Sequence, residues 1–189
     1  VAWGLIDTTQ IVETWRASRS EFGVLLATFL ATLTLQLEFA IYVGVGLSLI
    51  LYLRRTSQPG VEDVKPVPGR SAPMFSTDTG LPDCPQLKIV RINGSLFFGA
   101  VNHLQEAFQA IDEANPAHRH VLLVASGINF IDLGGAHMLA QEAARRKALG
   151  GALYITHLKD EPMATLRQSG VYDQIGSSHF FRAGQDTLA

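Results

Sequence analysis

Three side chains of this sequence, Ser126, Asp132 and His157, have the residue types of a hydrolase triad. In such a triad a histidine activates a serine nucleophile and a carboxylate orients the histidine. The Gly-x-Ser-x-Gly turn that commonly presents the nucleophile is missing around Ser126. We therefore expect no catalytic residues and interpret the chain as a protein other than an enzyme.

The histidines raise the question of a metal site, because His118 and His120 are two residues apart and four others are scattered. Zinc ligands usually come at characteristic spacings, such as HExxH or paired cysteines. Neither pattern occurs, and Cys84 is the only cysteine, which excludes an internal disulfide. We predict no metal and no cofactor, and interpret residues 118–120 as a solvated loop before a strand.

Asp132 stands before an apolar helical pattern and is followed by Gly134 and Gly135. A carboxylate at this position accepts hydrogen bonds from the first backbone N–H groups of a helix, and the same groups also attract anionic ligands. Asp132 is thus a predicted N-cap, and a role in binding a nucleotide or a protein partner stays open beside it. We expect the two glycines to let this loop approach a neighbouring strand.

Charge elsewhere gives weaker signals. The net charge of −2 argues against nucleic acid as a partner, because phosphate binding needs an excess of basic residues on one face. The basic run at residues 145–147 indicates a solvated helix end, with acidic lipid or a transporter body as less favoured contacts. Glu38 is interpreted as a loop residue rather than as an ion-coupling carboxylate.

An apolar run extends from Phe22 to Leu53, interrupted only by Gln36 and Glu38 as strongly polar residues and lacking Lys and Arg. One helix of this length would measure roughly 48 Å, whereas the hydrocarbon core of a bilayer is about 30 Å thick. Two short, tilted membrane helices that turn near residues 35–38 fit better. Gly44 and Ser48 form a small-xxx-small pair that would let another helix approach, although they are equally well ordinary small residues.

The flanks of this run support a hairpin. Ser18 and Glu21 have the spacing of a capping box, and Asp7 has the position to open a short preceding helix through Trp15. A hairpin puts the basic residues before and after it on one side, which the positive-inside rule makes cytoplasmic. These residues are Arg16, Arg19, Arg54 and Arg55.

Residues 56–86 contain six of the eight prolines in the chain. We expect this segment to be a semi-extended, proline-rich linker without packed elements.

Residues 87–189 have the pattern of a small α/β domain with a mixed sheet and helices packed against it. Asn93-Gly94 between two apolar runs predicts a β-hairpin of residues 87–92 and 95–100. A helix follows to Asn115-Pro116, then a buried strand at 121–125 and a helix after Asp132. The later elements are a strand at 152–158, a helix at 160–169, a short strand at 179–181 and the start of a helix at 185–189.

The segment from Ser126 to Gly135, with Asn129, Asp132, Gly134 and Gly135, resembles the STAS domain in its Phe-Ile-Asp-x-x-Gly motif. That domain occurs in sulfate permease (SulP) transporters and in bacterial anti-sigma-factor antagonists. Residues 28–32 and 44–48 resemble the last two membrane helices of SulP proteins. Gly134 departs from the antagonists, which carry a phosphorylated serine there, and Val124 replaces an acidic residue common in them. Both departures favour the transporter branch.

The resemblance implies the C-terminal part of a secondary anion transporter of the sulfate or bicarbonate type, beginning inside a longer protein. Residues 1–55 would be transmembrane helices of a multi-pass protein of the inner (plasma) membrane, and residues 87–189 a cytoplasmic STAS domain. Membrane lipid, the remaining transporter helices and a second copy would be partners, and the domain would regulate transport and dimerisation. The alternative is a membrane-tethered STAS signalling module that binds a cytoplasmic protein without phosphorylation.

Overall fold

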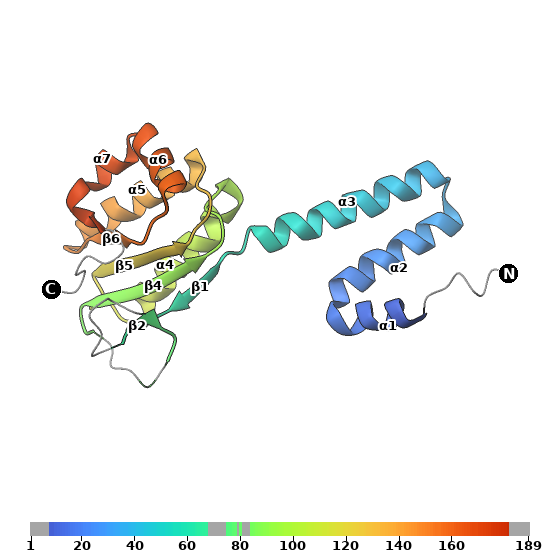
Figure 1. Ribbon diagram of the computed structural model, residues 1–189, viewed down its shortest axis with the longest axis horizontal. Coiled ribbons are helices and arrows are strands. Elements are labelled where there is room, and N and C mark those ends of the chain that lie inside the picture. Colours follow the sequence, from blue (N-terminus) through green and yellow to red (C-terminus); the bar gives the residue numbers. More distant parts are fainter. Residues whose placement is uncertain (1–7, 68–74, 79, 81–83, 182–189) are drawn as a thin grey trace. The chain divides into compact units, whose positions relative to one another are not determined.

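The computed structural model describes residues 8–67, 75–78, 80 and 84–181 (Figure 1). The chain divides into two compact units, Val1–Arg55 and Thr56–Ala189. Each unit has its own internal contacts and is described by itself.

The first unit consists of helices α1 (Thr8–Ala17), α2 (Arg19–Thr34) and α3 (Leu37–Thr56). The last residue of α3 lies at the boundary between the two units. Ser18 caps α2 as predicted, since its hydroxyl accepts a hydrogen bond from the Glu21 N–H at 3.2 Å. The two long helices are separated at Leu35 and Gln36, close to the predicted turn. Glu38 lies in the first turn of α3, so its interpretation as a loop residue is wrong. Asp7, the expected start of the first helix, lies outside the described residues.

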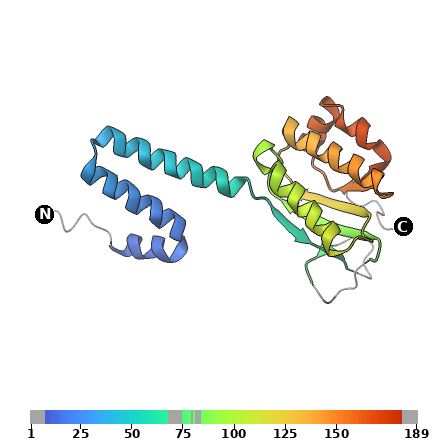
Figure 2. The same cartoon turned by 180° about the vertical axis from the view of Figure 1, so that it is seen from behind.

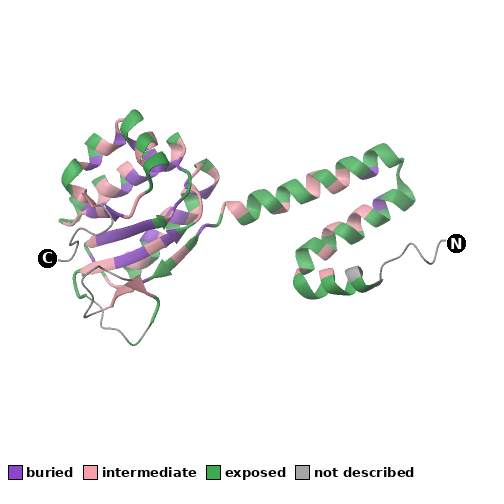
Figure 3. Ribbon diagram, viewed as in Figure 1, coloured by how far each residue is buried: buried purple, intermediate pink, exposed green. Residues whose placement is uncertain are grey.

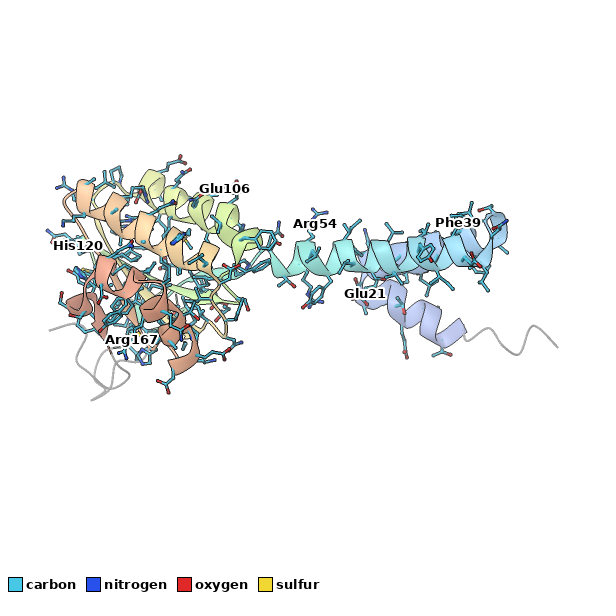
Figure 4. All side chains as sticks on the ribbon, turned by 90° about the horizontal axis from the view of Figure 1, so that it is seen from above. Glu21, Phe39, Arg54, Glu106, His120 and Arg167 are labelled. Atoms are coloured by element: carbon cyan, nitrogen blue, oxygen red, sulfur yellow. The ribbon has the colours of Figure 1, made fainter. Side chains whose placement is uncertain are left out.

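Most residues of α2 and α3 are exposed, and most of these exposed residues are apolar (Figure 3). Within these two helices only Ala31 and Ala40 are buried, and Phe39 near the start of α3 is 56% exposed (Figure 4). Among the described residues, α3 alone is long and apolar enough to cross a membrane, with a mean hydropathy of 1.6. The 16 residues of α2 reach only about 24 Å. The two consecutive helices α2 and α3 are present as predicted. That both enter the membrane stays a prediction.

The second unit is built on a five-stranded sheet in the order β1-β4-β5-β6-β7. Strand β1 is antiparallel to β4 and the other neighbours are parallel, so the predicted mixed sheet is confirmed. The strands are β1 (Gly60–Asp63), β4 (Leu87–Asn93), β5 (His120–Gly127), β6 (Leu153–Thr156) and β7 (Phe180–Phe181). Two further strands, β2 (Lys65–Pro66) and β3 (Phe75–Ser76), pair with each other.

Helices cover one face of this sheet (Figure 2). They are α4 (Val101–Ala114), α5 (Leu133–Ala148), α6 (Asp160–Gln168) and α7 (Val171–Ile175), together with the 3-10 helices η2 (Phe98–Ala100) and η3 (Ser177–His179). Strand β5 alternates between two cores, as expected for a central strand: Val121 and Leu123 face the helices, and Leu122 and Val124 join the second cluster. Because both faces are covered there, β5 has apolar residues at every position from 121 to 125.

The linker prediction is wrong for residues 60–66. Strand β1 pairs with β4 from Gly60↔Asn93 to Asp63↔Val90, and Val64 is 1% exposed in the second core cluster. An edge strand needs hydrogen-bonding groups on one side only, so a short polar segment between two prolines can form it. Proline content alone does not prevent a four-residue strand.

The predicted hairpin at Asn93-Gly94 is also wrong. Both edges of β4 are already occupied, one by β1 and the other by β5, so no edge remains for residues 95–100. Leu96 instead forms a single parallel bridge with Ile131, and η2 leads directly into α4. Gly94 has a φ of 145°, outside the range of a type I′ turn.

The remaining elements agree with the sequence except near the C-terminus. Helix α4 ends at the predicted Asn115 cap, and Gly170, with a φ of 72°, follows the end of α6. Helix α7 was not predicted. The helix expected at residues 185–189 lies outside the described part of the chain.

Candidate functional site

The carboxylate of Asp132 joins the start of α5 to the segment before α4. Its Oδ1 accepts a hydrogen bond from the Gly135 N–H at 2.8 Å, and its Oδ2 accepts one from the Phe98 N–H at 3.0 Å. The N-cap prediction is confirmed. Both oxygens serve the fold, so a ligand would meet the backbone around this carboxylate rather than a free acid.

The two glycines that follow Asp132 lie in the first turn of α5, against residues 96–98. A Cβ on Gly135 would lie 2.3 Å from the Leu96 carbonyl oxygen, and one on Gly134 would lie 3.2 Å from the Phe98 Cα. The Leu96 N–H donates to the Phe130 carbonyl and the Asp132 N–H donates to the Leu96 carbonyl, each at 2.9 Å. The expected close approach is thus present, but its neighbour is the segment 96–98 at the start of η2 rather than a strand.

Asn129, the fourth residue of the candidate loop, is tied to another element. Its Oδ1 accepts a hydrogen bond from the Nζ of Lys159, the N-cap residue of α6. Asn129 and Asp132 therefore lie on the loop before α5, and Gly134 and Gly135 lie in the first turn of α5. Together they connect η2, α5 and α6. Their role as a regulatory-ligand site stays a prediction.

Three exposed apolar side chains flank this loop: Phe98 is 76% exposed, Phe130 47% and Leu133 58%. We call these residues the apolar patch. The sequence interpretation missed it, although Phe130 and Leu133 directly bracket the Ile131-Asp132 pair. Large apolar side chains concentrated beside one loop often mark an interaction surface.

The hydrolase residue types do not interact with one another in the structure. The hydrogen bonds of Asp132 go to backbone N–H groups, and the His157 Nδ1 lies 2.9 Å from the Thr156 hydroxyl. In the described part of the chain no group of three or more histidine, cysteine or acidic side chains is placed to hold a metal ion. His118 is 8% exposed and within 3.2 Å of the Asn115 amide, so the solvated-loop interpretation is wrong for this residue.

The basic run at residues 145–147 is likewise not a simple solvated helix end, because Arg146 is fully buried. Its guanidinium pairs with Glu142 at 2.6 Å and with Asp112 at 2.5 Å, and it donates to the His118 carbonyl at 3.0 Å. Arg145 pairs with the same two carboxylates. We call Asp112, Glu142, Arg145 and Arg146 the ion cluster.

The ion cluster borders a shallow cavity of about 380 Å³, lined by Asp112, Pro116, His118, Arg119, Arg145 and Leu149. The hydrogen bond with Glu142 is the main cause that raises the pKa of Arg145 above its ordinary value, with Asp112 contributing in the same direction. Two carboxylates therefore hold the Arg145 guanidinium at the border of this cavity.

In the first unit, Gly44 marks the approach of α3 to α2. A Cβ on Gly44 would lie 3.0 Å from the Thr28 hydroxyl and methyl groups, whereas Ser48 is exposed. Gly44 therefore packs against Thr28 of α2, within the hairpin. The role of Ser48 stays a prediction.

Comparison with known proteins defines the class of the second unit. The STAS domain model matches residues 79–186, more than half of the sequence. The chain belongs to the STAS domain family.

Its relatives extend the similarity beyond that domain, to the C-terminal part of sulfate transporters of the SulP/SLC26 group. The chain is 23% identical over 184 residues to the putative sulfate transporter YvdB of Bacillus subtilis. This alignment covers 96% of this chain and 32% of the relative. It is 24% identical to the probable sulfate transporter 4.2 of Arabidopsis thaliana, over 98% of this chain and 29% of the relative. It is 28% identical to the probable sulfate transporter Rv1739c of Mycobacterium tuberculosis, over 94% of this chain and 32% of the relative. The chain thus spans about a third of the length of the curated relatives it matches, and the resemblance seen in the sequence is confirmed.

Two solved structures share the fold. The structure of SLC26A9 superposes with a TM-score of 0.80 at 18% identity, covering 93% of this chain and 31% of that one. Murine Slc26a9, an anion transporter in the inward-facing state, gives a TM-score of 0.81 at 20% identity, covering 93% and 29%.

Proposed function

We propose that the chain is the C-terminal part of a secondary anion transporter, with its helical unit in the membrane and its STAS domain regulating transport. One observation carries the proposal. Similarity to sulfate transporters covers 94–98% of the chain and so includes α3, the apolar helix that precedes the STAS domain. A soluble antagonist-like domain would have no use for such a helix.

The orientation follows from the charges at the end of α3. Arg54 and Arg55 lie in its last turn, and basic residues at a membrane boundary favour the cytoplasmic side. The STAS domain, which begins directly after them, would then lie in the cytoplasm. The protein would be a multi-pass protein of the inner (plasma) membrane, with lipid around the helical hairpin.

The substrate proposed is an inorganic anion such as sulfate or bicarbonate. Residues 22–53 contain no Lys or Arg to attract it, so the anion site would be formed by the remaining transporter helices. Those helices and a second copy of the protein are the proposed partners. The STAS domain would stabilise the homodimer.

Regulation through residues 129–135 would work without phosphorylation, because Gly134 has no hydroxyl group. A nucleotide or a protein partner would bind the backbone of this loop, where the first N–H groups of α5 gather. The hydrogen bond of Asp132 to Phe98 and the close approach of Gly135 to Leu96 would keep the loop in one conformation.

Uptake of radiolabelled sulfate by the whole protein in proteoliposomes tests the proposal. We expect uptake that excess unlabelled sulfate competes, and a lower rate when residues 57–189 are removed. Lack of uptake of both sulfate and bicarbonate, together with capture of one tight cytoplasmic partner, would favour the signalling-module alternative.

A further inference from the structure

The apolar patch of Phe98, Phe130 and Leu133 is not used by the STAS core. Phe98 is the most exposed large apolar residue of the second unit among those described, at 76%. The Phe98 backbone is nevertheless held firmly, because its N–H donates to Asp132 and its Cα lies against Gly134. The fold therefore presents these side chains on a fixed backbone, and their exposure is not the result of a loose loop.

The patch lies beside the point where the chain enters the STAS domain. A Cβ on Gly99, the residue after Phe98, would lie 2.9 Å from the Ser57 hydroxyl. The His103 Nε2 lies 3.2 Å from the Pro59 carbonyl, and a Cβ on Gly94 would lie 2.8 Å from the Pro59 Cβ. Residues 57–59 are thus packed directly against the segment that carries Phe98.

This position limits the distance between the patch and the lipid when α3 crosses the membrane. Arg54 and Arg55 would then mark the headgroup region. Ser57 is three residues after Arg54 and therefore at most about 10 Å from it along the chain. Because Gly99 lies against Ser57, the chain itself limits how far the segment that carries Phe98 can lie from this boundary.

The electrostatics of the patch suit an anionic surface. Helices α4 and α5 both begin here, so the positive ends of two helix dipoles point toward the patch. Within the described residues, the first turns of both helices contain no acidic side chain. The acidic residue closest in sequence, Asp132, uses both oxygens on backbone N–H groups.

We propose that Phe98, Phe130 and Leu133 insert into the headgroup region of anionic lipid and hold the STAS domain against the membrane surface. This inference rests on the proposed function, because it requires α3 to cross the membrane. Two aromatic rings and a leucine beside positive helix ends have the chemistry of a small interfacial anchor. The occupant is the lipid surface itself, not a protein partner.

Spin-label accessibility in the 189-residue chain tests the inference. The chain, with Cys84 replaced by serine, is reconstituted in nanodiscs of phosphatidylcholine and phosphatidylglycerol. One label is placed at Leu133→Cys, a control at Leu149→Cys and a membrane reference at Leu49→Cys. Leu149 is a matched control, because it is a leucine with 48% exposure directly after the other end of α5, about 24 Å away.

For each label we compare the ratio of its collision rate with oxygen to its collision rate with a water-soluble nickel chelate. We expect this ratio to be about tenfold higher for the Leu133 label than for the Leu149 label. A Phe130→Cys label provides a second site in case Leu133→Cys folds poorly, and circular dichroism monitors folding. The preference should weaken when phosphatidylglycerol is omitted.

Three outcomes overturn the inference. If the Leu49 label is in lipid and the Leu133 label is as water-accessible as Leu149, the patch does not touch the membrane, while the proposed function stands. If the Leu133 label is shielded from both reagents, protein covers the patch. If the Leu49 label is itself in water, α3 does not cross the membrane and the proposed function fails as well.

Discussion

At the scale of single residues, Asp132 contributes to the fold through two hydrogen bonds that leave in different directions. Asp132 accepts one bond from the Gly135 N–H in the first turn of α5 and the other from the Phe98 N–H at the start of η2. Charge-assisted bonds of this kind are stronger than those between neutral groups. The motif that marks the family in the sequence therefore has a structural explanation that requires no ligand.

Replacing Asp132 by alanine should remove both bonds and lower the free energy of unfolding of residues 56–189 by about 1–2 kcal/mol. Urea denaturation followed by circular dichroism measures the change. Asp173→Ala, at an exposed position of α7, serves as a control and should change it by less than about 0.5 kcal/mol. Equal effects of the two substitutions would contradict the bridging role of Asp132.

Gly135→Ala should be far more damaging than Gly134→Ala. The new methyl group at position 135 would lie 2.3 Å from a backbone oxygen, which cannot move without shifting residues 96–98. We expect a loss of at least about 2 kcal/mol, against a change within about 1 kcal/mol at position 134, where higher helix propensity offsets a mild contact. The same denaturation assay compares the two variants, and similar losses would show that the close approach is unimportant.

At the scale of elements, the ion cluster fixes α5 against α4 and the loop that follows α4. Arg146 reaches Asp112 of α4, Glu142 of its own helix and the carbonyls of Phe108 and His118. A buried guanidinium is tolerated only when its donors are satisfied in this way. Because the pKa of Arg145 is raised above an already high ordinary value, its contribution is present throughout the neutral range and is lost only in strong alkali.

Arg146→Met keeps most of the side-chain volume but leaves Glu142 and Asp112 with one cation fewer. We expect it to destabilise the domain by about 3–5 kcal/mol, because a partly unpaired acidic cluster remains buried. Arg145→Met, at a site that is 37% exposed, should cost about 1 kcal/mol or less, since solvent replaces the lost partner. Thermal denaturation of both variants decides the point; a larger loss at Arg145 would contradict the structure.

At the scale of the whole molecule, the chain contains two units with different surfaces. The first exposes leucine, phenylalanine and tyrosine along α2 and α3, and the second buries its apolar residues in two clusters around one sheet. The boundary falls at the end of α3 rather than at the end of a tether, because residues 60–66 belong to the STAS unit.

A chain that begins at residue 56 should therefore be more stable than one that begins at residue 87. Removing residues 56–86 takes β1 from the edge of β4 and removes Val64 and Phe75 from the second core cluster. We expect the shorter chain to melt at least about 5 °C lower and to aggregate through the uncovered edge. Equal melting temperatures, with both chains monomeric in size-exclusion chromatography, would restore the linker interpretation.

The sequence by itself determined the elements whose signals are local. The serine at the start of α2, the N-cap of Asp132, the continuous apolar run of β5 and the alternation of helices and strands each follow from a few neighbouring residues. Only the tertiary structure decided which strands pair, because the partners of β4 lie far from it in the chain and removed the edge that Asn93-Gly94 would have used. The burial of Arg146 and the exposure of Phe98 were decided in the same way: each depends on segments distant in sequence, and local residue types cannot encode that contact.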